Sequence, residues 1–194
     1  MPTSKRQRLT AAVLSLGLIG SSPAAIAADP ALEPSLYEAA TDVLLHLQAH
    51  PAAPDLPNLT AQDWADAAGL VADWYVLAVT GQAQGRAEIV SALAQTLTLL
   101  ADGPRVMILR DYHAENLLHL PDRSGIARAG LLDFQLAQMG QPGYDLVSLL
   151  QDARRDVPAP IETAMIARFS KARGLDLAAF QASYAALGAL RSLL

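Results

Sequence analysis

The fold of this chain is decided by the stretch 106-VMILRDYHAENLLHL-120 together with the later stretch 129-AGLLDFQ-135. Their continuous apolar runs are typical of short buried strands, which we expect at 106–109, 117–120 and 129–134. Three polar residues, Asp111, Asn116 and Asp133, lie between these runs or at the end of one. Burying a polar group is costly unless a partner or ligand uses it, so these residues are the first candidates for a functional site.

Helical periodicity surrounds the strands on both sides. Apolar residues recur every three or four positions and predict helices at 35–50, from Thr60 or Asp63 to Thr80, at 86–100, 145–155 and 160–172, and from Asp176 to the end. Trp64, Trp74 and Tyr75 fall at helical spacing, so we expect them in the core. The pattern predicts an α+β fold that is predominantly α-helical.

The composition restricts the class of protein. The chain has 194 residues, of which 52% are hydrophobic, and a formal net charge of −5. This is enough apolar material for a core, and the acidic balance argues against a nucleic-acid-binding protein. Because there is no cysteine, disulfides, thiolate zinc sites and a cysteine nucleophile are excluded. Lys5 and Lys171 are the only lysines.

The first 28 residues differ in character from the rest. Basic residues at 5, 6 and 8 precede an apolar stretch at 9–19, and Ala25-Ile26-Ala27 resembles a signal-peptidase site. The apolar stretch is too short for a membrane span, and no other segment is long and apolar enough to be one. We therefore divide the chain into residues 1–28, a signal peptide or a non-native beginning, and a domain at 29–194.

The polar residues between the strands match the needs of phosphoryl transfer. One carboxylate must accept the proton of the attacking hydroxyl, and hard oxygen ligands must hold Mg²⁺ against the phosphates. Asp111 suits the role of the base, and Asn116 and Asp133 suit that of the metal ligands. The alternative is a polar loop with Asx turns between strands. A metal-dependent hydrolase using Asp111, His113 and Asp133 is a further alternative, but its spacing matches no hydrolase signature.

These motifs resemble those of the protein-kinase-like superfamily, whose catalytic loop reads D-x-x-x-x-N and is followed by a metal-binding Asp. The strings RDYHAENLL, GLLDFQ and GYDLVSLLQD are most similar to the aminoglycoside/choline phosphotransferase family, and within it to bacterial anomeric kinases of N-acetylmuramate and N-acetylglucosamine. The resemblance implies the C-terminal lobe of a kinase-like fold, ATP and Mg²⁺ as cofactors, and a small-molecule acceptor.

The resemblance also implies supporting roles for residues around Asp111. Asp145, which opens the helix after the metal loop, is expected to bond back to the catalytic-loop backbone, and Arg110 is expected to brace that loop. His113 is a possible substrate contact, although a half-buried structural role is the simpler interpretation. Arg154 and Arg155 are expected to be solvated.

The sequence departs from the family pattern in three places. Leu109 replaces a histidine of the loop, and Leu136 replaces an acidic residue near the metal site. No strands, glycine-rich loop or phosphate-binding lysine precede the helices, so the N-terminal lobe is expected to be absent and the kinase truncated, with reduced or no activity. The alternatives are a catalytically silent remnant and an exported helical binding protein. Because a kinase needs ATP, a cytoplasmic location is favoured over a secreted or periplasmic one.

Overall fold

The helices form most of the fold in the computed structural model, which describes residues 31–52 and 55–194. Their bounds, in chain order, are α2 Glu33–Gln48, α3 Ala61–Ala68, η1 Ala72–Val76, α4 Leu77–Thr80, α5 Arg86–Leu100, α6 Tyr144–Leu150, α7 Ala159–Ala172 and α8 Leu177–Arg191. Most predicted helices are therefore present. The proposed division at residue 28 lies outside the described residues.

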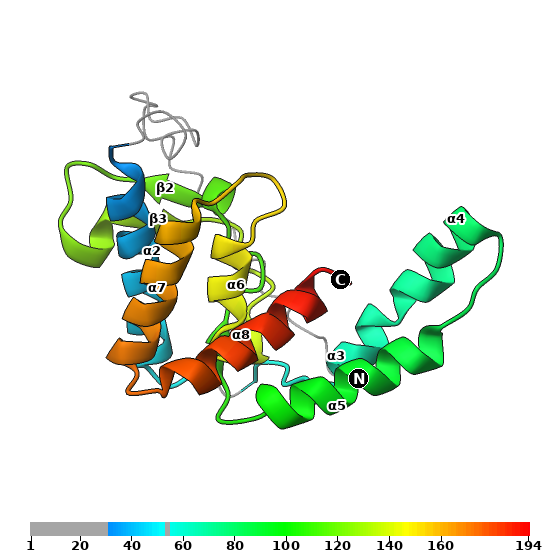
Figure 1. The fold of residues 1–194 in the computed structure, drawn as a ribbon. Coiled ribbons are helices and arrows are strands. Elements are labelled where there is room, and N and C mark those ends of the chain that lie inside the picture. Colours follow the sequence, from blue (N-terminus) through cyan, green and yellow to red (C-terminus); the bar gives the residue numbers. More distant parts are fainter. Residues whose placement is uncertain (1–30, 53–54) are drawn as a thin grey trace, which may run out of the picture.

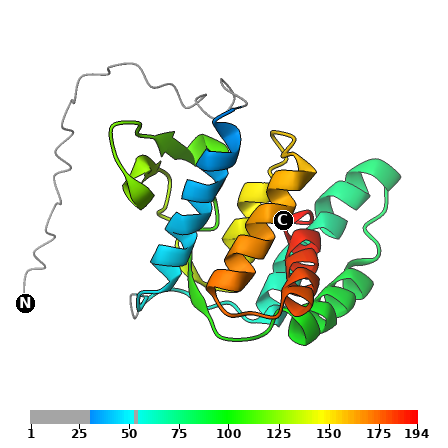
Figure 2. The same cartoon turned by 60° about the vertical axis from the view of Figure 1, so that its left-hand side comes forward.

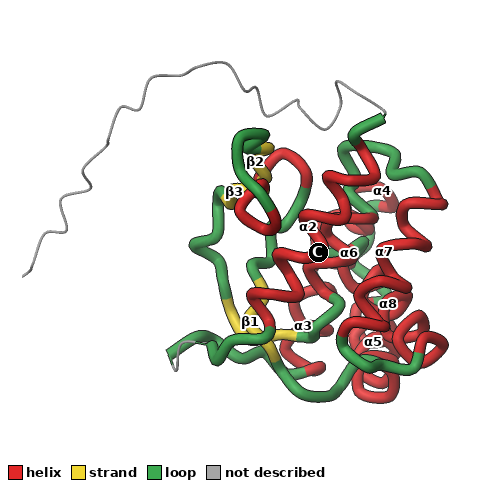
Figure 3. Tube along the Cα trace, turned by 90° about the vertical axis from the view of Figure 1, so that its left-hand side faces the viewer, coloured by secondary structure: helices red, strands yellow, loops and turns green. Residues whose placement is uncertain are grey.

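The strands pair into two small antiparallel sheets. β1 (Val106–Ile108) pairs with β4 (Gln138–Gly140), and β2 (Leu117–His119) pairs with β3 (Ala129–Leu131). Figure 3 shows the strands along one side of the molecule and most helices on the other. Three of the four strands were predicted; β4 was not, because Gln-Met-Gly carries no apolar run and its pairing partner lies about 30 residues earlier. The mixture of helices and small sheets agrees with the predicted α+β class.

The core lies where α2, α6, α7 and α8 meet. Figure 2 shows α2, α6 and α7 next to one another, with α8 beside α7. α6 is buried along its whole length, so it forms the centre of the packing. Trp64 of α3 is fully buried and stacks on Tyr144 of α6 with ring centroids 5.1 Å apart. This contact joins the arm formed by α3 and α5 to the core.

The helix predicted from Thr60 to Thr80 begins as expected but changes character. Thr60 caps α3 through a reciprocal capping box with Asp63. The segment η1 is a π-helix, and its wider turn rotates the following side chains away from the buried stripe. Trp74 and Tyr75 are 74% and 67% exposed, so the prediction that they are core residues is wrong. In Figure 1, α4 extends away from the rest of the molecule, beyond the reach of the core.

The helix predicted to reach residue 155 ends at Leu150. The Asp152 carboxylate accepts a hydrogen bond from the backbone N–H of Arg154, an Asx turn that competes with continued helix. The turn brings Arg155 against Glu33 of α2, with 3.3 Å between Nη2 and Oε1. The Arg155 side chain is only 22% exposed, so its prediction as a solvated residue is wrong.

No helix among the described residues is long and apolar enough to cross a membrane.

Candidate functional site

A buried carboxylate binds the backbone of the loop that follows β1. Asp145, at the start of α6, accepts hydrogen bonds from the backbone N–H of Leu109 at 2.7 Å and of Arg110 at 2.9 Å. The side chain of Asp145 is fully buried. The two N–H groups that this carboxylate binds lie more than 30 residues before it in the chain, so the conformation of the loop depends on the packing of α6.

Burial changes the acidity of this carboxyl. It raises the pKa of Asp145 from its ordinary value to about 6, against the opposing effects of the two backbone hydrogen bonds and of nearby Arg191. The charged form is therefore retained at neutral pH because the amides and Arg191 compensate for the lost hydration.

Two further contacts anchor the loop. The Tyr112 hydroxyl donates to the carbonyl oxygen of Ala40 in α2 at 2.8 Å, and Arg191 of α8 donates to the carbonyl oxygen of Arg110 at 3.3 Å. Arg110 has a φ of 70°, a conformation that non-glycine residues seldom adopt. Such backbone persists where surrounding contacts over-determine it, as they do here.

Within the loop, Asp111, His113 and Asn116 meet. The amide nitrogen of Asn116 donates to the backbone oxygen of Asp111 at 2.9 Å and lies 3.2 Å from its carboxylate. His113 Nε2 lies 3.2 Å from the other carboxylate oxygen and 3.1 Å from the Asn116 amide nitrogen. His113 is buried, whereas the Asp111 side chain is 37% exposed. The structure thus places the histidine behind the carboxylate and the carboxylate at the surface.

Asp133 reaches the same region through the β2–β3 sheet. The backbone N–H of Leu132 donates to the carbonyl oxygen of Asn116 at 2.9 Å, which extends the strand pairing by one step. Paired strands lie about 5 Å apart, and Asp133 directly follows the residue that lies opposite Asn116. Asp133 is exposed and has a φ of 55°, the second non-glycine residue with positive φ among those described.

The donor set of these residues fits a magnesium ion. The Asn116 amide nitrogen is turned toward the loop, which leaves its carbonyl oxygen as a free acceptor, and Asp133 adds a carboxylate of which one oxygen accepts from Gln135. Mg²⁺ prefers a few such oxygens and completes its shell with water and phosphate oxygens. The described residues hold no group of three or more His, Cys, Asp or Glu residues arranged to bind a metal alone.

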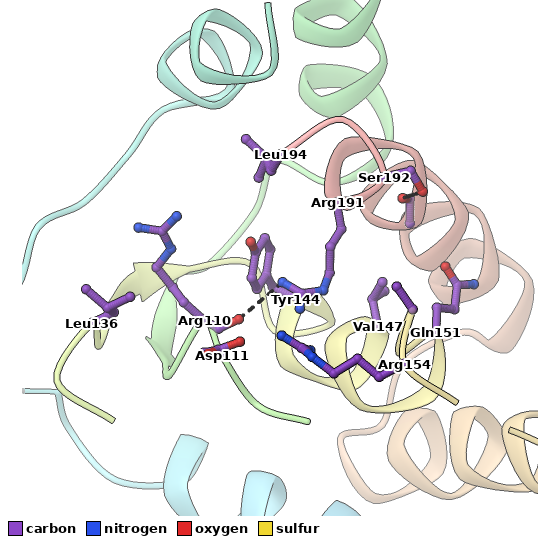
Figure 4. A pocket seen from close by; sticks show the side chains of 12 residues that line it. Arg110, Asp111, Leu136, Tyr144, Val147, Gln151, Arg154, Arg191, Ser192 and Leu194 are labelled. Carbon is purple, nitrogen blue, oxygen red and sulfur yellow. Dashed lines mark hydrogen bonds between the residues drawn. The ribbon is translucent and has the colours of Figure 1, made fainter. Parts of the chain in front are cut away.

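A pocket of about 510 Å³ opens beside Asp111 (Figure 4). Its polar lining includes Arg110, Arg154, Gln151 and Arg191, and Tyr144 forms part of one wall. Figure 4 shows the Arg154 side chain extending toward Asp111 and Arg191 descending from α8. Arg191 was not predicted as a site residue, because no local motif marks it and only the packing of α8 on α6 brings it to the loop. Gln151 lies within the string GYDLVSLLQD, but that string gave it no role.

Comparisons with known proteins give two matches. A family model described as the phosphotransferase enzyme family matches residues 10–186. A protein of Caulobacter vibrioides named N-acetylmuramate/N-acetylglucosamine kinase is 39% identical over 186 residues, which cover 81% of this chain and 47% of the relative. The chain thus spans about half the length of the curated relative that it matches.

Proposed function

Because this chain belongs to the phosphotransferase enzyme family, we propose that it transfers the γ-phosphoryl group of ATP to a hydroxyl of a small amino sugar, such as N-acetylmuramate or N-acetylglucosamine. The observation that most supports this proposal is the placement of Asp111 and Asn116 in one loop whose backbone is bonded to buried Asp145. A reaction that consumes ATP favours a cytoplasmic location.

In this proposal Asp111 is the general base. Its carboxylate is partly exposed at the pocket, while the Asn116 amide and the His113 ring approach it from behind and fix its orientation. It accepts the proton of the acceptor hydroxyl as the oxygen of that hydroxyl bonds to phosphorus and the bond to the ADP oxygen breaks. Holding the base in one orientation reduces the entropy lost on reaching the transition state.

Asn116 and Asp133 are the proposed metal ligands. ATP supplies the phosphoryl group, and Mg²⁺ neutralises the negative charge of its phosphates. Asn116 contributes its side-chain oxygen, which its inward-facing amide nitrogen leaves free, and Asp133 contributes a carboxylate oxygen. Arg110 and Asp145 position the loop without touching the reacting atoms.

A second candidate is a silent kinase-like protein that binds the acceptor and transfers nothing. It is favoured by one observation: the only lysine among the described residues, Lys171, lies near the end of α7. No lysine in the described part of the chain belongs to the segments that carry Asn116 and Asp133, the residues proposed to hold the nucleotide phosphates through Mg²⁺. In this case the acceptor would still bind while ADP formation stayed at the background rate.

The experiment that tests the proposal is ADP release measured with Mg²⁺, ATP and each amino sugar. We expect release that depends on both metal and sugar, and that falls at least a hundredfold in Asp111→Asn. Asp122→Asn, which changes an exposed carboxylate in the turn before β3, is the matched control and should retain full activity. ADP release equal in Asp111→Asn and the parent protein would contradict the proposal.

A further inference from the structure

Three arginines from separate parts of the chain line the pocket beside Asp111. Arg110 belongs to the loop after β1, Arg154 to the turn after α6, and Arg191 to the last turn of α8. Asp111 is the one acidic residue among the lining residues. The chain as a whole carries a net charge of −5, so this concentration of guanidinium groups contrasts with the rest of the molecule.

These guanidinium groups retain unused hydrogen-bond donors. Within residues 31–52 and 55–194, neither Arg110 nor Arg191 forms an ion pair, and Arg110 Nε is buried without a hydrogen-bond partner. Arg191 donates one hydrogen bond to the carbonyl oxygen of Arg110 and lies near the buried Asp145. The guanidinium of Arg154 makes only long contacts, 3.6 Å to Glu115 and 3.4 Å to Asp152, and the side chain is 49% exposed. A planar anion would satisfy donors of this kind with paired hydrogen bonds.

The position of the pocket distinguishes two possible sources of that anion. Asp111 lines the pocket, whereas the proposed metal ligands Asn116 and Asp133 do not. A group bound in the pocket therefore borders the base but not the proposed metal ligands, as an acceptor must and metal-bound phosphates would not. The volume of about 510 Å³ is sufficient for one amino sugar.

We propose that the acceptor carries a carboxylate, which Arg154 and Arg191 bind while the acceptor hydroxyl faces Asp111. This inference rests on the proposed function and narrows its substrate. N-acetylmuramate has a carboxylate on its lactyl ether, and N-acetylglucosamine lacks that group, so the pocket favours the first sugar over the second. Arg154 and Arg191 are the residues that determine this preference.

Direct binding of each sugar to the full chain, measured by titration calorimetry without nucleotide, tests the inference. We expect N-acetylmuramate to bind at least tenfold more tightly than N-acetylglucosamine. Arg154→Gln should reduce this ratio to about twofold or less, because it removes a guanidinium that binds the carboxylate. The Arg154 side chain is half-exposed, so the substitution should leave the core intact. Arg191→Gln should act in the same direction. Arg123→Gln, which changes an exposed arginine outside the pocket, is the matched control and should preserve the ratio.

Several results would overturn the inference: equal binding of the two sugars, binding of neither, or an Arg154→Gln variant that weakens ATP binding instead of N-acetylmuramate binding. ADP release tests the proposed function separately from these binding measurements. Selective binding without ADP release would retain the carboxylate site and overturn the phosphotransferase proposal. ADP release with equal binding of both sugars would overturn the carboxylate site alone.

Discussion

Asp145 binds the backbone of Leu109: its Oδ2 accepts a hydrogen bond from the N–H of Leu109 at 2.7 Å, although the two residues are 36 positions apart in the sequence. Its other oxygen accepts the N–H of Arg110, where the backbone has positive φ. One side chain thus satisfies two adjacent donors of the loop that carries Asp111. Because Asp145 also opens α6, the helix at the centre of the core, the geometry of the site is coupled to the packing of the fold.

Asp145→Ala should lower activity more than stability. The substitution leaves two N–H groups without their acceptor, which we expect to cost about 2–4 kcal/mol in the free energy of unfolding. It also releases the loop, so kcat should fall at least a hundredfold at temperatures where the variant remains folded. Urea denaturation and ADP release measure the two effects.

Asp176→Ala is the control for that comparison. Asp176 caps α8 and accepts the N–H of Ala179 at 2.8 Å, away from the loop. Its loss should cost about 1 kcal/mol of stability and leave kcat unchanged. A purely structural role for Asp145 would instead make activity follow the folded fraction in both variants.

The raised pKa of Asp145 predicts a specific dependence of stability on pH. Burial raises this pKa from 3.8 to about 6, so between these values the folded state holds a proton that the unfolded chain has released. The stability contributed by this group is complete below about pH 4 and is lost as the pH rises through about 6. Relative to Asp145→Asn, which has no such proton, the parent protein should lose up to about 3 kcal/mol from pH 4 to pH 7.

Denaturation curves of the parent protein and of Asp145→Asn across this pH range test that prediction. Taking the difference between the two proteins removes the contributions of the other titrating groups. A difference that stays constant, or that changes in favour of the parent protein as the pH rises, would contradict a raised pKa at Asp145.

Asn116→Ala should increase the concentration of Mg²⁺ needed for half-maximal ADP release by at least tenfold. The variant loses the side-chain oxygen proposed to bind the metal and the hydrogen bond to the Asp111 carbonyl, whose loss should cost about 1 kcal/mol of stability. Asn58, the other asparagine of the chain, is exposed, so Asn58→Ala is the matched control. An unchanged Mg²⁺ requirement in Asn116→Ala would remove Asn116 from the metal site.

The two tryptophans should respond in opposite ways to truncation. Trp64 is fully buried and stacked on Tyr144, so Trp64→Ala should cost about 3–5 kcal/mol of stability. Trp74 is 74% exposed, and Trp74→Ala should change the stability by no more than about 0.5 kcal/mol. Acrylamide should quench the fluorescence of Trp74 in the Trp64→Phe variant far more strongly than that of Trp64 in Trp74→Phe. Equal quenching would mean that the π-helical segment packs against the core.

Local pattern was sufficient for the starts of two helices and for three strands. Helix starts at Thr60 or Asp63 and at Asp176 were predicted from side chains placed before apolar periodicity, and the structure has Thr60 as the N-cap of α3 and Asp176 as the N-cap of α8. Three strands could be predicted because they are continuous apolar runs. The exposure of Trp74 could not be predicted, because a π-turn adds a residue that the spacing of an α-helix does not anticipate.

By itself, the sequence determined most of the helices, three of the four strands, and the D-x-x-x-x-N spacing that places Asp111 and Asn116 in one loop. It also indicated Asp133 and Asp145 as candidates; the roles of all four residues in catalysis stay predictions. Only the tertiary structure decided that Arg191 of α8 reaches this loop, and that Arg154 and Arg191 share one pocket with Asp111. The reason is physical: these contacts join residues far apart in the chain, and the packing of α8 on α6 creates them.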